Sequence, residues 1–237
     1  MEKSFYRSFL QEIQKDRKQL AILIDPDKFD ISQTQVFLEK IPSQTTHLFV
    51  GGSTAEMEDT ERTVAALKEE SNLPIFLFPG DYSQITNGAD VLLFLTLLSG
   101  RNPEYLIGQQ VKSISKLRNS NLEIIPAGYI LVDGGNESSV SKVTQTQPLT
   151  QENIEHIVNT ALAGKYMGAK IIYLEAGSGA KFPVKPAVIS QVKNALKNSQ
   201  IDEEILLIVG GGIRNEVQKQ AAYNAGADMV VMGTAFE

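Results

Sequence analysis

The sequence of 237 residues contains no cysteine and only two histidines. The absence of cysteine excludes disulfides, thiolate catalysis and zinc–sulfur sites, and it fits a protein of a reducing cytoplasm. The chain also lacks any Lys/Arg-rich run, and its formal net charge is −6. Because proteins that bind nucleic acid depend on basic residues that contact phosphates, we do not expect nucleic acid to be a partner.

Long hydrophobic runs are also missing. The longest apolar stretch lies around residues 91–98, which is far short of the roughly 20 residues that a membrane-spanning helix needs. Residues 1–6 contain no apolar core of a signal peptide. We therefore expect a cytoplasmic protein without a transmembrane segment.

Short apolar runs recur along the chain, and most of them end in glycine or polar residues. We predict strands that begin near residues 20, 47, 74, 91, 122, 170, 205 and 229. Continuous apolar runs are typical of strands covered on both faces, as in parallel sheets. Eight such units in a chain that is 42% hydrophobic predict an α/β fold, a (β/α)8 TIM barrel, as one domain over residues 1–237. The alternative is a doubly wound open sheet, but no GxGxxG follows the first strand.

Three segments fall outside the regular alternation. Residues 2–18 carry Phe5, Phe9 and Ile13 at helical spacing, which predicts an amphipathic helix over the bottom or side of the barrel. Residues 133–151 are polar and show no periodicity, so we expect a long loop that is either disordered or a functional lid. The chain ends soon after the eighth strand, so a closing helix is missing. We expect either that another element caps the barrel or that the chain stops short of the usual end.

Three successive predicted strands near the end of the chain run into glycine. The first is followed by Gly177 and Gly179, the second by a glycine triplet at 210–212, and the third by Gly233. Glycine lets backbone N–H groups approach an anion closely, and Ser178 adds a hydroxyl donor. In a (β/α)8 barrel the last loops commonly hold a phosphate, so the pattern predicts a phosphate site.

Glu175 ends an otherwise apolar predicted strand. A carboxylate at such a position is costly to bury, and it is usually paired or functional. We interpret it as a general base toward a hydroxyl of the bound ligand, or as an ion-pair partner of Lys28 or Lys181. Tyr173 points to the same side of the strand, where it either binds the ligand or packs in the barrel.

Asp25 lies at the mouth of the first predicted strand, and Ser53 lies at the mouth of the second. One carboxylate with one hydroxyl is a plausible protein contribution to Mg²⁺, which keeps waters and binds substrate phosphates. Asp25 and Ser53 are equally suited to capping the following turn or helix. We expect structural roles for His47 and His156, and the sequence leaves the direction of Arg214 open.

Four motifs in this order carry a resemblance to a known family. They are Asp-Pro-Asp-Lys at 25–28, Tyr-Leu-Glu-Ala-Gly-Ser-Gly at 173–179, Val-Gly-Gly-Gly-Ile-Arg at 209–214 and Gly-Thr at 233–234. Together with Gly-Gly-Ser-Thr at 51–54, they closely resemble the geranylgeranylglyceryl phosphate synthase family, which includes the bacterial heptaprenylglyceryl phosphate synthases. The resemblance covers nearly the whole chain.

This resemblance implies a prenyltransferase. The sn-3 hydroxyl of glycerol 1-phosphate would attack C1 of an allylic prenyl diphosphate, most simply geranylgeranyl diphosphate, to give an ether lipid precursor and pyrophosphate. It implies Mg²⁺ at Asp25 and Ser53, with Glu175 as the base or orienting group. The residues implied for binding glycerol 1-phosphate are Tyr173, Leu174, Glu175, Ala176, Gly177, Ser178, Gly179, Gly211, Gly212, Gly233 and Thr234. The family also suggests a homo-oligomer.

The prenyl tail would need an apolar groove, for which Phe76, Phe78, Leu93 and Leu95 are candidates, although they suit the core equally well. Two other functions remain open from the sequence. One is another phosphate-binding barrel, an isomerase or lyase that often needs no metal. The other is a noncatalytic phosphate- or flavin-binding module, in which Glu175 would be structural only.

Overall fold

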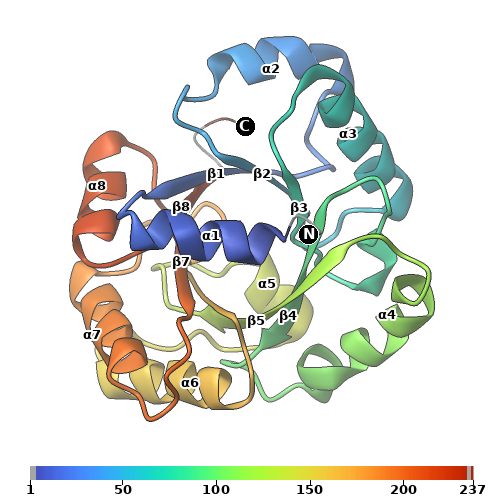
Figure 1. The fold of residues 1–237 in the computed structure, drawn as a ribbon. Helices are drawn as coiled ribbons and strands as arrows, with labels where there is room; N and C mark the ends of the chain where they lie inside the picture. Colours follow the sequence, from blue (N-terminus) through green and yellow to red (C-terminus); the bar gives the residue numbers. More distant parts are fainter. Residues whose placement is uncertain (1–3, 234–235, 237) are drawn as a thin grey trace.

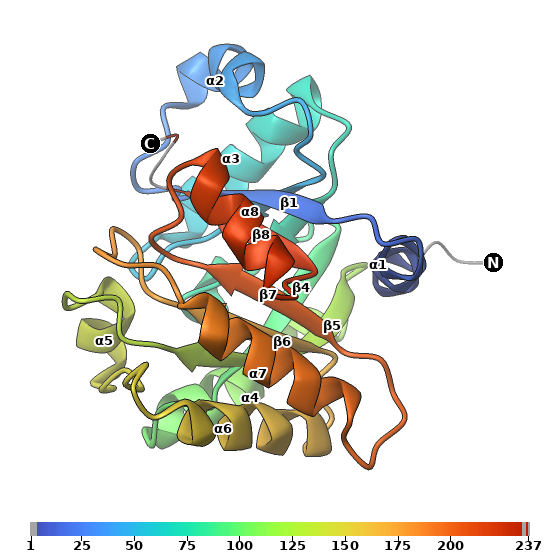
Figure 2. The ribbon, with the colours of Figure 1, turned by 90° about the vertical axis from the view of Figure 1, so that its left-hand side faces the viewer.

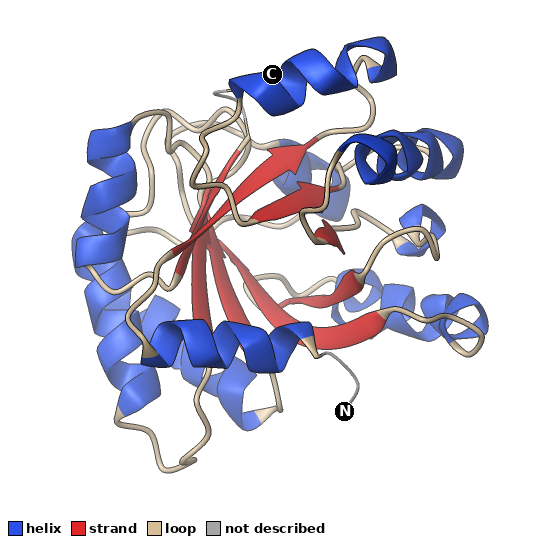
Figure 3. Cartoon of the chain, turned by 45° about the horizontal axis from the view of Figure 1, so that its top comes forward, coloured by secondary structure: helices blue, strands red, loops and turns tan. Residues whose placement is uncertain are grey.

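The computed structural model describes residues 4–233 and residue 236. Eight parallel strands pair in the order of the sequence, and β8 pairs with β1 to close the sheet into a barrel. Figure 3 shows the strands at the centre and helices around them. The predicted (β/α)8 barrel is therefore confirmed, and the open-sheet alternative is wrong.

The strands begin within one residue of the predicted positions. They are β1 (Gln19–Ile24), β2 (His47–Val50), β3 (Ile75–Leu77), β4 (Val91–Leu97), β5 (Glu123–Leu131), β6 (Ile171–Glu175), β7 (Leu206–Gly210) and β8 (Met229–Met232). The α-helices are α1 (Phe5–Gln14), α2 (Thr34–Lys40), α3 (Met57–Glu70), α4 (Gln109–Leu117), α5 (Ser139–Thr144), α6 (Ile154–Tyr166), α7 (Pro186–Lys197) and α8 (Glu216–Asn224). Three shorter helical segments are η1 (Ile31–Gln33), η2 (Tyr82–Gln84) and the π-helical η3 (Glu104–Gly108).

Two apolar layers hold the barrel together, one inside the strands and one between the strands and the helices. On β6, Tyr173 points into the interior layer, whereas Ile172 and Leu174 pack in the outer layer. The alternation explains why the strands read as continuous apolar runs, since both faces are removed from water. By the same alternation Glu175, two residues after Tyr173, lies on the inner side of the strand.

Helix α1 closes the barrel at the amino-terminal ends of the strands, as Figure 1 shows. Its buried Phe9 stacks on His47 at 4.5 Å between ring centroids and meets the ring of Phe76 edge-on at 5.6 Å. Burial lowers the pKa of His47 to about 3, which keeps the ring neutral in this apolar setting. Glu123 accepts hydrogen bonds from Ser4 Oγ and Phe5 N at the start of the helix. The predicted amphipathic helix and the structural place of His47 are confirmed.

The segment 133–151 is more ordered than the predicted loop. It contains α5, which Ser138 caps by accepting a hydrogen bond from Ser141 N at 3.1 Å. It also returns to the barrel, where Leu149 pairs with Val132 beside β5. The expectation of a structureless loop was wrong because a helix of only six residues, with two valines among them, is too short to leave a recognisable apolar periodicity in the sequence. Figure 2 shows α5 and α1 at opposite ends of the barrel.

Among the described residues, no helix combines the length and the apolar character needed to cross a membrane.

Candidate active site

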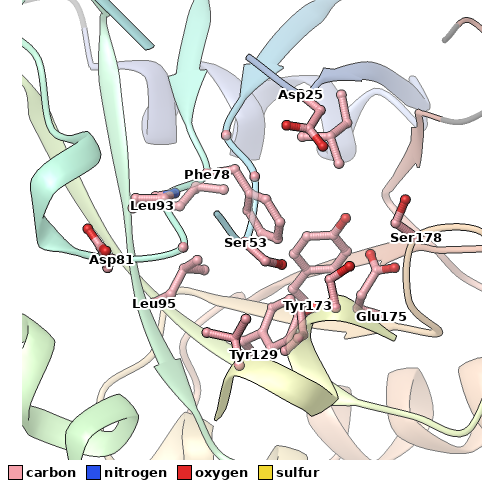
Figure 4. A pocket seen from close by; sticks show the side chains of 18 of the residues that line it. Asp25, Ser53, Phe78, Asp81, Leu93, Leu95, Tyr129, Tyr173, Glu175 and Ser178 are labelled. Carbon is pink, nitrogen blue, oxygen red and sulfur yellow. The ribbon is translucent and has the colours of Figure 1, made fainter. Parts of the chain in front are cut away.

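A pocket opens at the carboxyl ends of the strands. Asp25 follows β1, Ser53 follows β2, Phe78 follows β3, Glu175 ends β6 and Gly211 follows β7, and all of them line the pocket. Figure 4 shows Glu175 and Ser178 on one side and Leu93 and Leu95 on the other. The pocket therefore has a polar part and an apolar part within one cavity.

The Glu175 carboxylate is buried in the polar part, where the side chain is 6% exposed. Burial raises its pKa from 4.5 to about 7, while the nearby Tyr173 hydroxyl and the Gly177 N–H limit the rise. Gly177 N donates a hydrogen bond to Glu175 Oε1 at 2.8 Å. A carboxyl group with a pKa near neutrality exchanges protons readily at physiological pH, as a general base must.

An aromatic cluster forms the floor beneath Glu175. The ring of Tyr173 lies 5.1 Å from that of Phe78 and 5.5 Å from that of Tyr129. The Tyr173 hydroxyl lies beside the Glu175 carboxylate, yet it lacks a partner with good hydrogen-bond geometry within the described chain. Burial and the neighbouring Glu175 hold the pKa of Tyr173 well above its ordinary value, so the phenol stays protonated. It is therefore available to donate a hydrogen bond to a ligand.

Glycines after β6 and β7 form a backbone cradle beside Glu175. Gly177, Gly211 and Gly212 have φ values of +100°, +80° and +69°, a region that residues with side chains rarely adopt. A Cβ atom at Gly211 would lie 2.3 Å from Glu175 Oε1 and 2.6 Å from Gly177 N. Only glycine fits at Gly211, and loops built of such glycines let backbone N–H groups approach an anion closely.

Arg214 supports this cradle from behind. Its Nη2 donates hydrogen bonds to the carbonyl oxygens of Ala180 at 2.8 Å and Gly179 at 3.3 Å. The side chain thus ties the loop after β7 to the loop after β6. The sequence left the direction of Arg214 open. In the structure its guanidinium group points to these two carbonyl oxygens, and the residue also lines the pocket.

Asp25 lies in the same pocket with Ser53. Its carboxylate forms an ion pair with Lys28 Nζ at 3.2 Å. A Cβ atom at Gly52 would lie 2.5 Å from Asp25 Oδ1, so the loop that carries Ser53 packs directly on this carboxylate. The two residues that we predicted for Mg²⁺ are therefore brought to one side of the site, although within the described ranges no cluster of three acidic or histidine side chains exists.

The apolar part of the pocket extends from Phe78 toward η3 and α5. Leu93 and Leu95 of β4, Tyr105 of η3 and Val140 of α5 line it. Three of the four candidates for a prenyl groove thus reach the pocket. Phe76 does not, because it lies deeper in the barrel against Phe9 of α1.

The structure places the predicted ligand residues as follows. Tyr173, Glu175, Ser178, Gly211, Gly212 and Gly233 line the pocket, and Gly177 and Gly179 belong to the cradle loop. The side chains of Leu174 and Ala176 pack in the outer apolar layer, so a role in binding would fall to their backbone. Thr234 lies outside the described residues. The roles of all these residues in binding and catalysis remain predictions.

Two contacts of the pocket were not predicted. Tyr129 packs edge-on against Tyr173, and Lys28, which the sequence offered as a partner of Glu175, pairs instead with Asp25. The position of Lys28 three residues after Asp25 could have indicated the second contact, whereas nothing in the sequence distinguishes Tyr129 from a core residue. His156 is exposed on α6, which fits a structural role.

Comparison with known proteins agrees with this geometry. A geranylgeranylglyceryl phosphate synthase from Zunongwangia profunda is 55% identical over 222 residues, which cover 94% of this chain and 92% of that protein. One from Thermococcus kodakarensis is 38% identical over 236 residues and covers 97% of this chain and 88% of that protein. Both support the resemblance that the four motifs carry.

Solved structures lead to the same group. Wild-type GGGPS from Thermoplasma volcanium superposes with a TM-score of 0.88 at 34% identity, covering 98% of this chain and 90% of that chain. A second structure has a TM-score of 0.87 at 30% identity and covers 99% of this chain and 92% of that chain. It is (S)-3-O-geranylgeranylglyceryl phosphate synthase from Thermoplasma acidophilum in complex with its substrate sn-glycerol-1-phosphate. The PcrB family model matches residues 11–237. The chain therefore belongs to the PcrB family, together with relatives named geranylgeranylglyceryl phosphate synthase.

Proposed function

We propose that this protein is a prenyltransferase that joins the sn-3 hydroxyl of glycerol 1-phosphate to C1 of an allylic prenyl diphosphate. The observation that carries this conclusion is the place of Glu175, a buried carboxyl group with a pKa of about 7 between a glycine cradle and an apolar channel. The relative from Thermoplasma acidophilum that binds sn-glycerol-1-phosphate supports the same substrate here.

The cradle after β6 and β7 holds the phosphate of glycerol 1-phosphate by backbone N–H groups and the Ser178 hydroxyl. This places the glycerol hydroxyls near Glu175, whose carboxylate takes the proton of the sn-3 hydroxyl as its oxygen bonds to C1. The bond between C1 and the diphosphate oxygen breaks, and pyrophosphate leaves with the bonding electrons. Holding both reactants in one pocket supplies much of the rate increase by proximity.

The diphosphate binds on the side of Asp25, Ser53 and Lys28. One carboxylate and one hydroxyl fit Mg²⁺, because this ion keeps several waters and takes other oxygens from substrate phosphates. When bound, the ion neutralises charge on the leaving diphosphate. Lys28 adds a positive charge on the same side, since its Nζ already lies 3.2 Å from Asp25 Oδ2.

The prenyl tail lies along the apolar wall of Phe78, Leu93 and Leu95. These side chains line the pocket beside the polar site, so a chain that starts at the diphosphate passes directly into them. Geranylgeranyl diphosphate is the donor that we expect, in keeping with the names of the relatives.

We further propose a homo-oligomer in the cytoplasm. Ile107 and Val111 are 59% and 64% exposed, and Ile114 is 40% exposed one turn further on. They form an apolar stripe on η3 and α4, and such a stripe is typical of a contact between proteins. Light scattering coupled to gel filtration would give the mass in solution and so test the oligomer.

A transfer assay tests the reaction. Radiolabelled glycerol 1-phosphate is incubated with Mg²⁺ and prenyl diphosphates of increasing length, and the product is extracted into an organic solvent. We expect label in the organic phase, highest with the geranylgeranyl donor and abolished by EDTA. Folded protein that binds glycerol phosphate but forms no product with any donor would favour another phosphate-binding barrel instead.

A further inference from the structure

Gln84 and Gln151 are among the glutamines buried at the carboxyl end of the barrel, and the reaction proposed above uses neither. Gln84 is the last residue of η2 and is 1% exposed, and Gln151 is the last residue of the segment 133–151 that contains α5 and is 7% exposed. Burying an amide is costly unless its donors and acceptors are paired. Both side chains meet this requirement by bonding to the backbone of loops that carry the site.

Gln84 joins the loop after β2 to the loop after β3. Its Nε2 donates a hydrogen bond to Gly52 O at 2.9 Å, and its Oε1 accepts one from Gly80 N at 2.9 Å. A Cβ atom at Gly80 would lie 2.4 Å from Gly52 O and 3.0 Å from the Cα of Ser53. The two loops are therefore in direct contact, and the amide of Gln84 fixes how they meet.

This contact sets the place of Ser53 relative to Asp25. Gly52 packs so closely on the Asp25 carboxylate that a Cβ atom there would lie 2.5 Å from Oδ1. The segment η2 is itself anchored to α4, because Gln109 accepts a hydrogen bond from Tyr82 N and Lys116 donates one to Ser83 O. Gln84 thus connects a firmly held segment to the diphosphate side of the pocket.

Gln151 makes the corresponding contacts on the other side. Its Nε2 donates hydrogen bonds to Asp133 O at 2.7 Å and Pro183 O at 3.3 Å, and its Oε1 accepts one from Lys185 N at 2.6 Å. Pro183 lies against the cradle, since a Cβ atom at Gly212 would be 3.0 Å from Pro183 N. Gln151 therefore fixes the far end of the loop whose near end holds Gly177 and Ser178.

We propose that Gln84 and Gln151 are positioning residues that each serve one substrate. Gln84 holds the loop that binds the diphosphate, and Gln151 holds the loop that binds the glycerol phosphate. This inference rests on the proposed function for the identity of the two ligands. The separation follows from the geometry, because the hydrogen bonds of Gln84 reach only the loops after β2 and β3, whereas those of Gln151 reach only the loops after β5 and β6.

The test compares Gln84→Met and Gln151→Met with the wild-type protein. Methionine keeps the length of the side chain and removes all its hydrogen bonds to the loops. Gln220→Met is the matched control, because Gln220 is exposed on α8 and bonds only within that helix, to Asn224. Calorimetry measures the binding of sn-glycerol 1-phosphate and, separately, of inorganic pyrophosphate with Mg²⁺, and thermal unfolding checks that each variant is folded.

We expect Gln84→Met to weaken pyrophosphate binding by about tenfold or more, since small displacements of binding groups are costly. Its affinity for glycerol 1-phosphate should stay within about twofold of wild type, as for a distant substitution. Gln151→Met should show the reverse pattern, and Gln220→Met should change neither affinity. If either methionine variant does not fold, Gln84→Asn and Gln151→Asn keep the amide and shorten its reach by one methylene, so that the hydrogen bonds to the loops are lost or stretched, and the same pattern is expected.

The inference would be overturned if both variants fold and each lowers the affinity for both ligands equally, or for neither. A purely structural role lowers thermal stability without distinguishing the ligands. Failure of the proposed function looks different. In that case the wild-type protein binds both ligands and forms no ether product, while the variants still separate the two affinities.

Discussion

Replacing Glu175 with glutamine removes the proposed base and preserves the shape of its side chain. The amide can still accept the hydrogen bond from Gly177 N that Oε1 accepts in the native site. It cannot take a proton from the sn-3 hydroxyl. Since a positioned general base contributes about 10²- to 10⁴-fold to the rate, kcat should fall by that factor while the affinity for glycerol 1-phosphate changes little.

The pH dependence of the wild-type enzyme should show the same group. Because the pKa of Glu175 is raised to about 7, the carboxylate is mostly protonated at lower pH. We expect kcat/KM to rise with pH, to reach half of its plateau at about pH 7 and to level off above about 8, with about one-tenth of the plateau value at pH 6. The residual activity of Glu175→Gln should lack this rise.

The raised pKa also has a consequence for stability. In the unfolded chain the carboxyl group ionises at its ordinary pKa of 4.5, whereas in the folded chain it ionises at about 7. The unfolded state therefore binds fewer protons between these values, and the free energy of unfolding falls as pH rises through this window. The loss for the wild-type protein amounts to about 3 kcal/mol at most, and Glu175→Gln should avoid it.

Thermal unfolding at pH 5 and pH 8 measures this difference. At each pH, the Tm of wild type is subtracted from the Tm of the variant. For a chain of this size this difference should be roughly 5 to 10 °C larger at pH 8 than at pH 5. A variant that retains wild-type kcat would refute the assignment of Glu175 as the base. Equal Tm differences at both pH values would refute the account of its burial.

Other substitutions test separate parts of the structure. Asp25→Asn should lower kcat/KM for the prenyl diphosphate by about tenfold or more, because charge-assisted contacts are the strong ones, and should raise the Mg²⁺ concentration needed. Unchanged Mg²⁺ dependence in a titration of activity would argue against a metal at Asp25. Gly211→Ala should abolish measurable binding of glycerol 1-phosphate in calorimetry, since the new Cβ would lie 2.3 Å from Glu175 Oε1 at a φ of +80°. Normal affinity in this variant would show that the cradle tolerates a side chain. Phe9→Ala should destabilise the fold by about 3–5 kcal/mol through loss of the stack on His47, with kcat of the folded protein unchanged. A normal denaturation midpoint would mean that α1 does not secure the barrel.

The sequence was sufficient to place the strands because their residues are buried on both faces. In β6, Ile172 and Leu174 enter the outer layer while Tyr173 enters the interior, so the whole strand had to be apolar. Glu175 was recognisable for the same reason, as the one acidic residue at the end of that run. The positive φ values of Gly177 and Gly211 likewise required glycine, which is visible in the sequence.

Features that depend on contacts between distant loops could not be predicted. Phe76 and Phe78 occupy equivalent positions two residues apart, and only their height along the barrel places one against Phe9 and the other in the pocket. Gln84 and Gln151 resemble surface residues in the sequence, because their burial follows from loops that pack over them. The bonds that they form have no local sequence pattern.

Isotope tracing tests the central claim most directly. Glycerol 1-phosphate labelled with ¹⁸O at the sn-3 hydroxyl is incubated with Mg²⁺ and geranylgeranyl diphosphate, and mass spectrometry follows the label. If that hydroxyl is the nucleophile that Glu175 activates, fragmentation of the product finds the ¹⁸O in the ether bond between glycerol and the prenyl chain, and none appears in pyrophosphate. An ¹⁸O that remains in a free hydroxyl of the product, or that appears in pyrophosphate, would contradict the mechanism.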